Sequence, residues 1–252
     1  MKVTEPTNLA TEGNMSVSGA SASISTVDNL VDTKTLKSYI ASDAGSGVTI
    51  TIDLGGTKTV DLVALANLDN LTDDEVTIAL NLATVEQASE TVEIDTPVQQ
   101  TYAHATFDSV SCDEVTITFA SSGQFELGYL FVGAFADYDV DPQAFQISWE
   151  SADPVSIARA GNPQTSTTYI AMALQITLKK LPYADMKTAM LPLLSNGYGN
   201  PVFWLFDEEC LITDAVILAT LDAGTISLDP ILAPTVEDRN LCSTTIGLLE
   251  VF

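Results

Sequence analysis

The chain has 252 residues, of which 46% are hydrophobic, so it is long enough for one large or two ordinary domains with apolar cores. It carries 9 Lys and Arg against 34 Asp and Glu, a formal net charge of −25, which disfavours nucleic acids and anionic membrane surfaces as direct partners. No apolar run approaches the roughly 20 residues of a membrane-spanning helix. Met1–Pro6 lacks the apolar core of a signal peptide, so we expect a protein made in the cytoplasm.

Residues 1–30 are rich in Ser, Thr, Ala, Gly and Asn, and we expect an extended arm or a loose edge strand there. Short strands separated by turn residues, without amphipathic helices, then predict a jelly-roll β-sandwich over residues 31–137. The predicted strands are Val48–Leu54, Thr59–Ala66, Glu75–Ala83, Glu90–Ile94, Gln100–Phe107, Glu114–Phe119 and Phe125–Phe135.

Two of these strands differ in their pattern of apolar residues. Val48–Leu54 alternates β-branched apolar residues with polar ones, which indicates one face toward a core and one toward water. The next strand contains the nearly continuous apolar run Val60–Leu65, a pattern that suits a strand covered on both sides. We expect Gly55 and Gly56 to turn the first strand into the second, with Lys58 a solvated turn residue.

Residues 138–153 are rich in Asp and Pro and form a predicted linker, followed by a β-rich domain over residues 154–252. One helix is predicted near 183–196, because Met186, Ala189, Met190, Leu193 and Leu194 follow helical spacing. The predicted fold class is mostly β: an N-terminal jelly-roll sandwich and a β-rich α+β C-terminal domain with one helix.

Catalytic groups are scarce in this sequence. His104 is the only histidine, and neither a nucleophile-elbow motif nor a phosphate-binding glycine loop accompanies it. Cys112, Cys210 and Cys242 are widely spaced, which favours buried free thiols over a disulfide framework or a zinc site. We therefore expect no enzymatic activity. A glycan-degrading enzyme would need two carboxylates at a defined separation, which a sequence cannot reveal.

Two acidic groupings are candidates for calcium on ligand type alone, although no cofactor is expected. Asp137, Asp139 and Asp141 alternate along the chain, and Asp69, Asp73, Asp74 and Glu75 crowd a loop beside Asn70. Among apolar and aromatic residues, the candidates for an interface or for glycan contact are Trp149, Tyr198 and Phe252. Tyr129 is a further candidate for exposure, whereas Trp204 lies in an apolar run and is expected in the core.

Residues 29–135 resemble the discoidin-like, galactose-binding-like family of jelly rolls. The resemblance lies in Thr49–Gly55 (TITIDLG), in Thr59–Leu65 (TVDLVAL) and in Phe125–Gly133 (FELGYLFVG). It implies the sandwich fold and leaves the ligand open. The chain lacks the paired cysteines at the domain ends that sugar-binding members of the family carry.

The whole chain also resembles a group of tailed-bacteriophage virion proteins, through Arg159, Gly161, Leu178, Leu181 and Pro201. This resemblance implies a non-catalytic structural protein of the virion, at the tail tip or baseplate, that assembles in a symmetric ring with itself and with other tail proteins. One alternative is a carbohydrate-binding module that attaches to host-surface glycans. Another is a head–tail connector or capsid decoration protein.

Overall fold

The structure, a computed structural model, is built almost entirely from β-strands, which confirms the predicted mostly-β class. It describes residues 2–5, 7–19, 25–32, 38–41, 47–72, 75–94, 101–120, 123–137, 142–151, 155–157, 163–165, 170–182, 201–206, 215–230 and 241–250. The helix predicted near 183–196 lies outside the described residues.

Two compact units alternate along the sequence. Unit 1 contains Met1–Tyr138, Val202–Leu218 and Phe252, and unit 2 contains Asp139–Pro201 and Ala219–Val251. The domain boundaries derived from the sequence stay predictions. In unit 1 the described elements are β1 (Lys2–Thr4), β2 (Met15–Ser18), the 3-10 helix η1 (Val27–Val31), β3 (Tyr39–Ala41), β4 (Val48–Ala66), β5 (Val76–Leu82), β6 (Val85–Val92), β7 (Tyr102–Phe119), β8 (Phe125–Leu127), β9 (Tyr129–Gly133), β10 (Phe135–Asp137) and β15 (Val202–Phe206).

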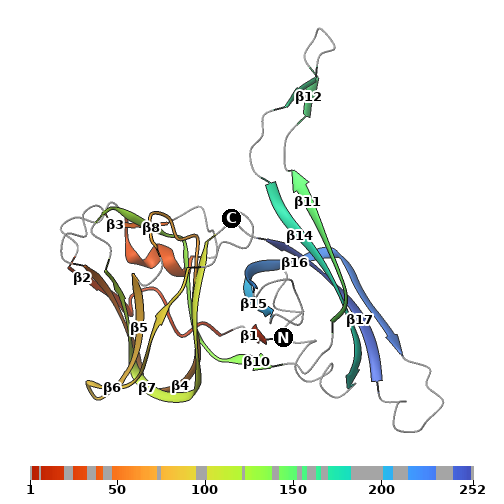
Figure 1. Ribbon diagram of the computed structural model, residues 1–252. Helices are drawn as coiled ribbons and strands as arrows, with labels where there is room; N and C mark the ends of the chain where they lie inside the picture. Colours follow the sequence, from red (N-terminus) through yellow and green to blue (C-terminus); the bar gives the residue numbers. More distant parts are fainter. Residues whose placement is uncertain are drawn as a thin grey trace. The chain divides into compact units, whose positions relative to one another are not determined.

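The long strands β4 and β7 are paired antiparallel and take part in both layers of the sandwich. Their first layer has the order β2-β4-β7-β5-β6, formed by the first part of β4 and the last part of β7. The later part of β4 pairs with β9 on one side and with the first part of β7 on the other. Figure 1 shows both long strands curving through the unit.

One detail of the sequence prediction is wrong here: the two predicted strands Val48–Leu54 and Thr59–Ala66 are one strand, β4. Gly55 and Gly56 have φ angles of 67° and 139°, which glycine adopts without the penalty that a Cβ would add. The pair register shifts between Asp53 and Lys58, so these glycines form a bulge that bends the strand instead of ending it. Lys58 is exposed there, as predicted.

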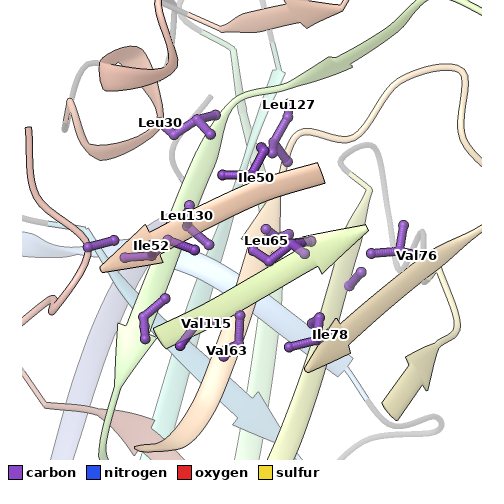
Figure 2. Close-up of a cluster of buried hydrophobic side chains, with 14 of the residues drawn as sticks. Leu30, Ile50, Ile52, Val63, Leu65, Val76, Ile78, Val115, Leu127 and Leu130 are labelled. Atoms are coloured by element: carbon purple, nitrogen blue, oxygen red, sulfur yellow. The ribbon is translucent and has the colours of Figure 1, made fainter. Parts of the chain in front are cut away.

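The main core lies between the two layers and is filled by side chains from β4, β5, β7, β8, β9 and η1. Figure 2 shows Ile50 and Ile52 of β4 near Leu65 from the later part of the same strand, Val115 of β7 and Leu130 of β9. The residues that alternate with them in β4, Thr49 and Thr51, are only partly buried, which confirms the predicted alternation.

The later part of β4 is covered on both sides, as its continuous apolar run predicts. Val60, Val63 and Leu65 belong to the main core, whereas Leu62, Ala64 and Ala66 belong to a second cluster. That second cluster also contains Tyr102, Tyr129, Phe131, Phe203 and Leu205. The last two come from β15, so a segment distant in sequence forms a third layer on the sandwich. Trp204, between them, is fully buried, as expected.

The N-terminal segment joins this third layer to the sandwich. β1 pairs antiparallel with both β10 and β15, and the Phe203 backbone N–H donates to Thr4 Oγ1 at 3.0 Å. Asn8 is tied to β9: its Nδ2 donates to the Leu130 carbonyl at 2.8 Å, and its Oδ1 accepts from Val132 N–H at 3.0 Å.

Unit 2 is built on a four-stranded antiparallel sheet in the order β11-β14-β17-β16. Its elements are β11 (Pro142–Ser151), β12 (Val155–Ile157), β13 (Pro163–Thr165), β14 (Ile170–Pro182), β17 (Leu241–Glu250) and the part of β16 (Ala215–Pro230) from Ala219 onward, with β12 and β13 paired to each other.

Candidate functional site: the loop after β4

The strongest candidate site in the described chain is the polar loop that follows β4, together with the residues that hold it. We call this the loop edge and define it as residues 67–72, Glu75, Ser38, Glu126 and Gly128. It lies at the end of the sandwich where β4 leaves the sheet and β5 begins. Part of it, Asp69 with Asn70 and Glu75, belongs to an acidic grouping that the sequence analysis singled out.

The backbone of the loop edge adopts a conformation that most residues avoid. Asn67 and Asn70 have φ angles of 58° and 61°, in the left-handed region that asparagine tolerates better than other non-glycine residues. Gly128 passes directly beside Asn67, and a Cβ on Gly128 would lie 2.6 Å from Asn67 Cβ. The Gly128 backbone N–H donates to the Ala66 carbonyl at 3.0 Å. Left-handed residues of this kind often occur at functional sites.

Hydrogen bonds fix the loop in this shape. Asp69 and Glu126 exchange two backbone bonds, with N···O distances of 3.0 and 3.1 Å. The Glu126 carboxylate accepts from the Ser38 hydroxyl. At the far end of the loop, Thr72 N–H and Oγ1 both donate to Glu75 Oε2, at 2.7 and 2.8 Å. These bonds connect the described part of the loop to β8 at one end and to the start of β5 at the other.

The chemistry that the loop edge offers is hydrogen bonding to neutral polar groups. Asp69, Asn70 and Thr72 are exposed and present a carboxylate, an amide and a hydroxyl. Asn70 Nδ2 donates to Asp69 Oδ2 at 3.2 Å, which orients the two side chains. The loop edge contains no basic residue, so an anionic ligand would find only repulsion there. Among the described residues, no group of three or more His, Cys, Asp or Glu is placed to hold a metal ion.

The residues proposed as sites from the sequence are not brought together in the part of the chain described. Asp137 is exposed in β10, opposite Lys2, whereas Asp139 and Asp141 lie outside the described residues. Trp149 is in β11 with Met172 as its cross-strand partner. Tyr198 and Phe252 also lie outside the described residues. The calcium and interface roles given to these residues stay predictions.

The structure also shows how far three other titratable residues are buried. Tyr129, a candidate for exposure, is 6% exposed because the β15 layer covers it, so that prediction is wrong; burial raises the pKa of its phenol. Cys112 is a buried free thiol, as predicted, and burial with the adjacent Asp113 raises its pKa to about 11. His104 is half-buried in β7 opposite Ala64.

The described residues contain no helix with the length and apolarity that crossing a membrane requires. No protein-family model matches the sequence, and no significant match was found among curated proteins.

The fold can be compared with solved structures of carbohydrate-binding modules. A lectin domain of lectinolysin, solved with the Lewis b antigen, shares 18% identity; the match covers 53% of this chain and 100% of that one, with a TM-score of 0.44. A fucose-binding module of Streptococcus pneumoniae shares 16% over 50% of this chain and 94% of its own, with a TM-score of 0.42. A chitosan-binding module from a Paenibacillus sp. IK-5 chitosanase/glucanase shares 17%, over 51% and 99%, with a TM-score of 0.41.

Proposed function

We propose that the protein is a non-catalytic carbohydrate-binding module whose loop edge binds neutral sugars. The observation that carries this proposal is the hydrogen-bonded part of the loop, residues 67–72 with Glu75, which presents Asp69, Asn70 and Thr72 to solvent. A carboxylate accepts hydrogen bonds from two neighbouring hydroxyls, and an amide both donates and accepts, so together they match the vicinal hydroxyls of a sugar ring. Preorganisation lowers the entropy that binding costs.

The charge of the chain further restricts the class of glycan that the loop edge would bind. A net charge of −25 and the lack of basic residues in the loop edge disfavour sulfated, uronic or sialylated glycans. Neither neutral nor cationic glycans are disfavoured by this charge, and the amide and hydroxyl of the loop edge suit the hydroxyls of a neutral sugar. The compared modules are named for fucose, Lewis b and chitosan, but their TM-scores are below 0.5, so the proposal rests on the loop edge alone. The phage-tail role implied by the sequence resemblance is favoured by no feature of the described residues and stays an untested prediction.

The test is a glycan array with the full chain, followed by titration calorimetry of any hit with wild type, Asp69→Asn and Asn70→Ala. Each substitution removes one or two hydrogen bonds to ligand, so we expect about a tenfold loss of affinity for each. Asp108→Asn is the matched control, because Asp108 is an exposed carboxylate in β7 outside the loop edge. The proposal fails if neutral glycans do not bind, or if Asp108→Asn weakens binding as much as Asp69→Asn does.

A further inference from the structure

The outward surface of the first sheet carries hydroxyl side chains in two straight rows. Along the first row, Thr49 of β4 lies opposite Thr118 of β7, which lies opposite Thr77 of β5. The second row runs parallel to it, two residues further along each strand. We call these rows the threonine face, and define it as Ser18, Thr49, Thr118, Thr77 and Thr91 in the first row and Ser16, Thr51, Thr116, Ala79 and Ser89 in the second.

The face is ordered and accessible in the structure. Every member of the two rows is partly or fully exposed, whereas the residues between them, Ile50, Ile78 and Ile117, are fully buried. Neighbouring hydroxyls contact each other across the strands: Thr49 Oγ1 and Thr118 Oγ1 are 3.3 Å apart. Thr77 Oγ1 and Thr91 Oγ1 are 3.2 Å apart. Threonine has few rotamers, so these contacts hold the hydroxyls in place.

The chemistry of the face disfavours anionic polymers and typical protein partners. It has no basic residue, and the next row along the strands contains Asp53 and Glu114, so anionic polymers are repelled. It has no aromatic, Met or Arg side chain, the residues in which protein–protein interfaces are enriched. Hydroxyls both donate and accept hydrogen bonds, so a neutral, hydroxyl-rich partner is the one that this face complements.

The spacing of the rows suits a polymer better than a single sugar. Adjacent strands are about 4.8 Å apart, so one row across the five strands spans about 19 Å. Each hydrogen bond to a neutral group contributes only about 0.5–1.5 kcal/mol, so a useful affinity needs several at once. A chain of sugars laid along the rows makes such contacts repeatedly.

The geometry points to a second binding surface: the threonine face binds neutral polysaccharide chains across the strands, away from the loop edge. This inference rests on the proposed function only for the class of ligand. The two sites differ in the length of ligand that they require. Binding at the loop edge is complete with a short oligosaccharide, whereas binding at the threonine face grows with the length of the chain.

The experiment uses the full chain and a panel of neutral polysaccharides (cellulose, chitin and amylose), with soluble oligomers of one to eight units from each. The test variant carries Thr49→Val, Thr77→Val, Thr91→Val and Thr118→Val, which keeps side-chain shape and strand propensity while removing the hydroxyls. The same four positions changed to Ser retain the hydroxyls. Thr57→Val with Thr59→Val makes the same chemical change at exposed positions of β4 outside the face.

We expect wild type and the Ser variant to bind at least one polysaccharide, with affinity rising along the oligomer series. We expect the Val variant to lose tenfold or more, and the Thr57/Thr59 control and Asp69→Asn to keep the rise with length. The inference is overturned if the Val variant binds polymer as wild type does while Asp69→Asn does not, an outcome that leaves the loop edge intact as the site. It is also overturned if no panel member binds, and the proposed function stands in that case as long as the glycan array gives a neutral glycan whose binding Asp69→Asn weakens. A third outcome also overturns the inference: wild type forms concentration-dependent dimers and the Val variant does not. The face would then be a surface for self-association.

Discussion

Two residues, Asn67 and Gly128, approach each other closely in the loop edge, and the position of Gly128 has no room for a side chain. Gly128→Ala places a Cβ 2.6 Å from Asn67 Cβ and 2.9 Å from its Nδ2, so one of the two segments must move. We expect a loss of about 1–3 kcal/mol in the free energy of unfolding, as in other overpacked sites. Urea denaturation measures this loss.

The matched control for that prediction is the double variant Gly128→Ala, Asn67→Gly. It removes the opposing Cβ, and glycine adopts the positive φ of position 67 without strain. We expect it to recover most of the lost stability. Additive losses in the two single variants would show that the close approach of these residues is not what matters.

Glu90 in β6 provides a second prediction at the scale of one residue. It lies opposite Ile78, so it is on the core-facing side of an edge strand, and burial raises the pKa of its carboxyl although much of the side chain is exposed. Because the folded protein holds this proton more tightly than the unfolded chain, ionised Glu90 opposes folding. The resulting loss in the free energy of unfolding appears as the pH rises above the usual glutamate pKa, and it persists at neutral pH.

Glu90→Gln should therefore raise the free energy of unfolding at pH 7 and leave it nearly unchanged at pH 3.5, where the carboxyl is protonated in both states. Thermal or urea denaturation at the two pH values measures the difference. Glu86→Gln removes the same charge from the same strand and controls for the general relief of negative charge. A gain at pH 7 no larger than that of the control would contradict the prediction.

At the scale of single elements, the hairpin between β5 and β6 contains avoidable strain. Ala83 and Thr84 form a two-residue connection, and both have positive φ, 49° and 69°, as in a type I′ turn. Asparagine and glycine adopt that geometry readily, whereas a β-branched threonine does so at a cost. The Ala83 backbone N–H donates to the Asp113 carboxylate at 3.1 Å, which helps to keep the turn in place.

The double substitution Ala83→Asn, Thr84→Gly should stabilise the protein by about 1–2 kcal/mol, because it relieves the strain and keeps the backbone hydrogen bond. The measurement is the urea midpoint at pH 7. Reversed order, Ala83→Gly with Thr84→Asn, serves as a composition control and should gain less, since Asn-Gly is the preferred order in this turn. A lower midpoint for the Asn-Gly variant would mean that the native turn is not strained.

How far the sequence predicts the structure differs from element to element. Periodicity correctly gave the alternating and the continuous parts of β4, because burial on one face or two is a local pattern. It did not show that these parts are one strand, since a glycine bulge and a glycine turn look alike in sequence. The acidic grouping around Asp69 pointed to part of the loop edge, but Ser38 and Glu126 join it only through pairings distant in sequence. The threonine rows were visible as Thr-x-Thr alternation without any sign of their alignment.

At the scale of the whole molecule, the sandwich depends on a strand that comes much later in the chain. Phe203 of β15 is fully buried, and its ring centroid lies 6.0 Å from that of Tyr129 and 6.4 Å from that of Phe131. Without it, the aromatic side of β9 and the second face of β4 would meet water. Their stability is therefore set in part by a residue outside the contiguous sandwich sequence.

Phe203→Ala should destabilise the N-terminal sandwich by about 3–5 kcal/mol, the usual cost of emptying a buried aromatic site. Hydrogen exchange monitored by mass spectrometry should show faster exchange in peptides covering residues 60–66 and 129–133. Val85→Ala is the control, because Val85 is 60% exposed and should change little. Unchanged exchange in those two peptides would show that the β15 layer does not support the sandwich.

The late position of β15 also has a consequence for how the protein is made. Phe206 follows Gly133 by 73 residues, so at the usual rates of synthesis the ribosome needs roughly 4 to 15 seconds between completing β9 and completing the strand that covers it. During that interval Tyr129, Phe131 and Leu62 of the nascent sandwich lack the strand that covers them. A chaperone that recognises aromatic surface would have its main opportunity on this chain then, and slow codons between residues 134 and 201 would lengthen it.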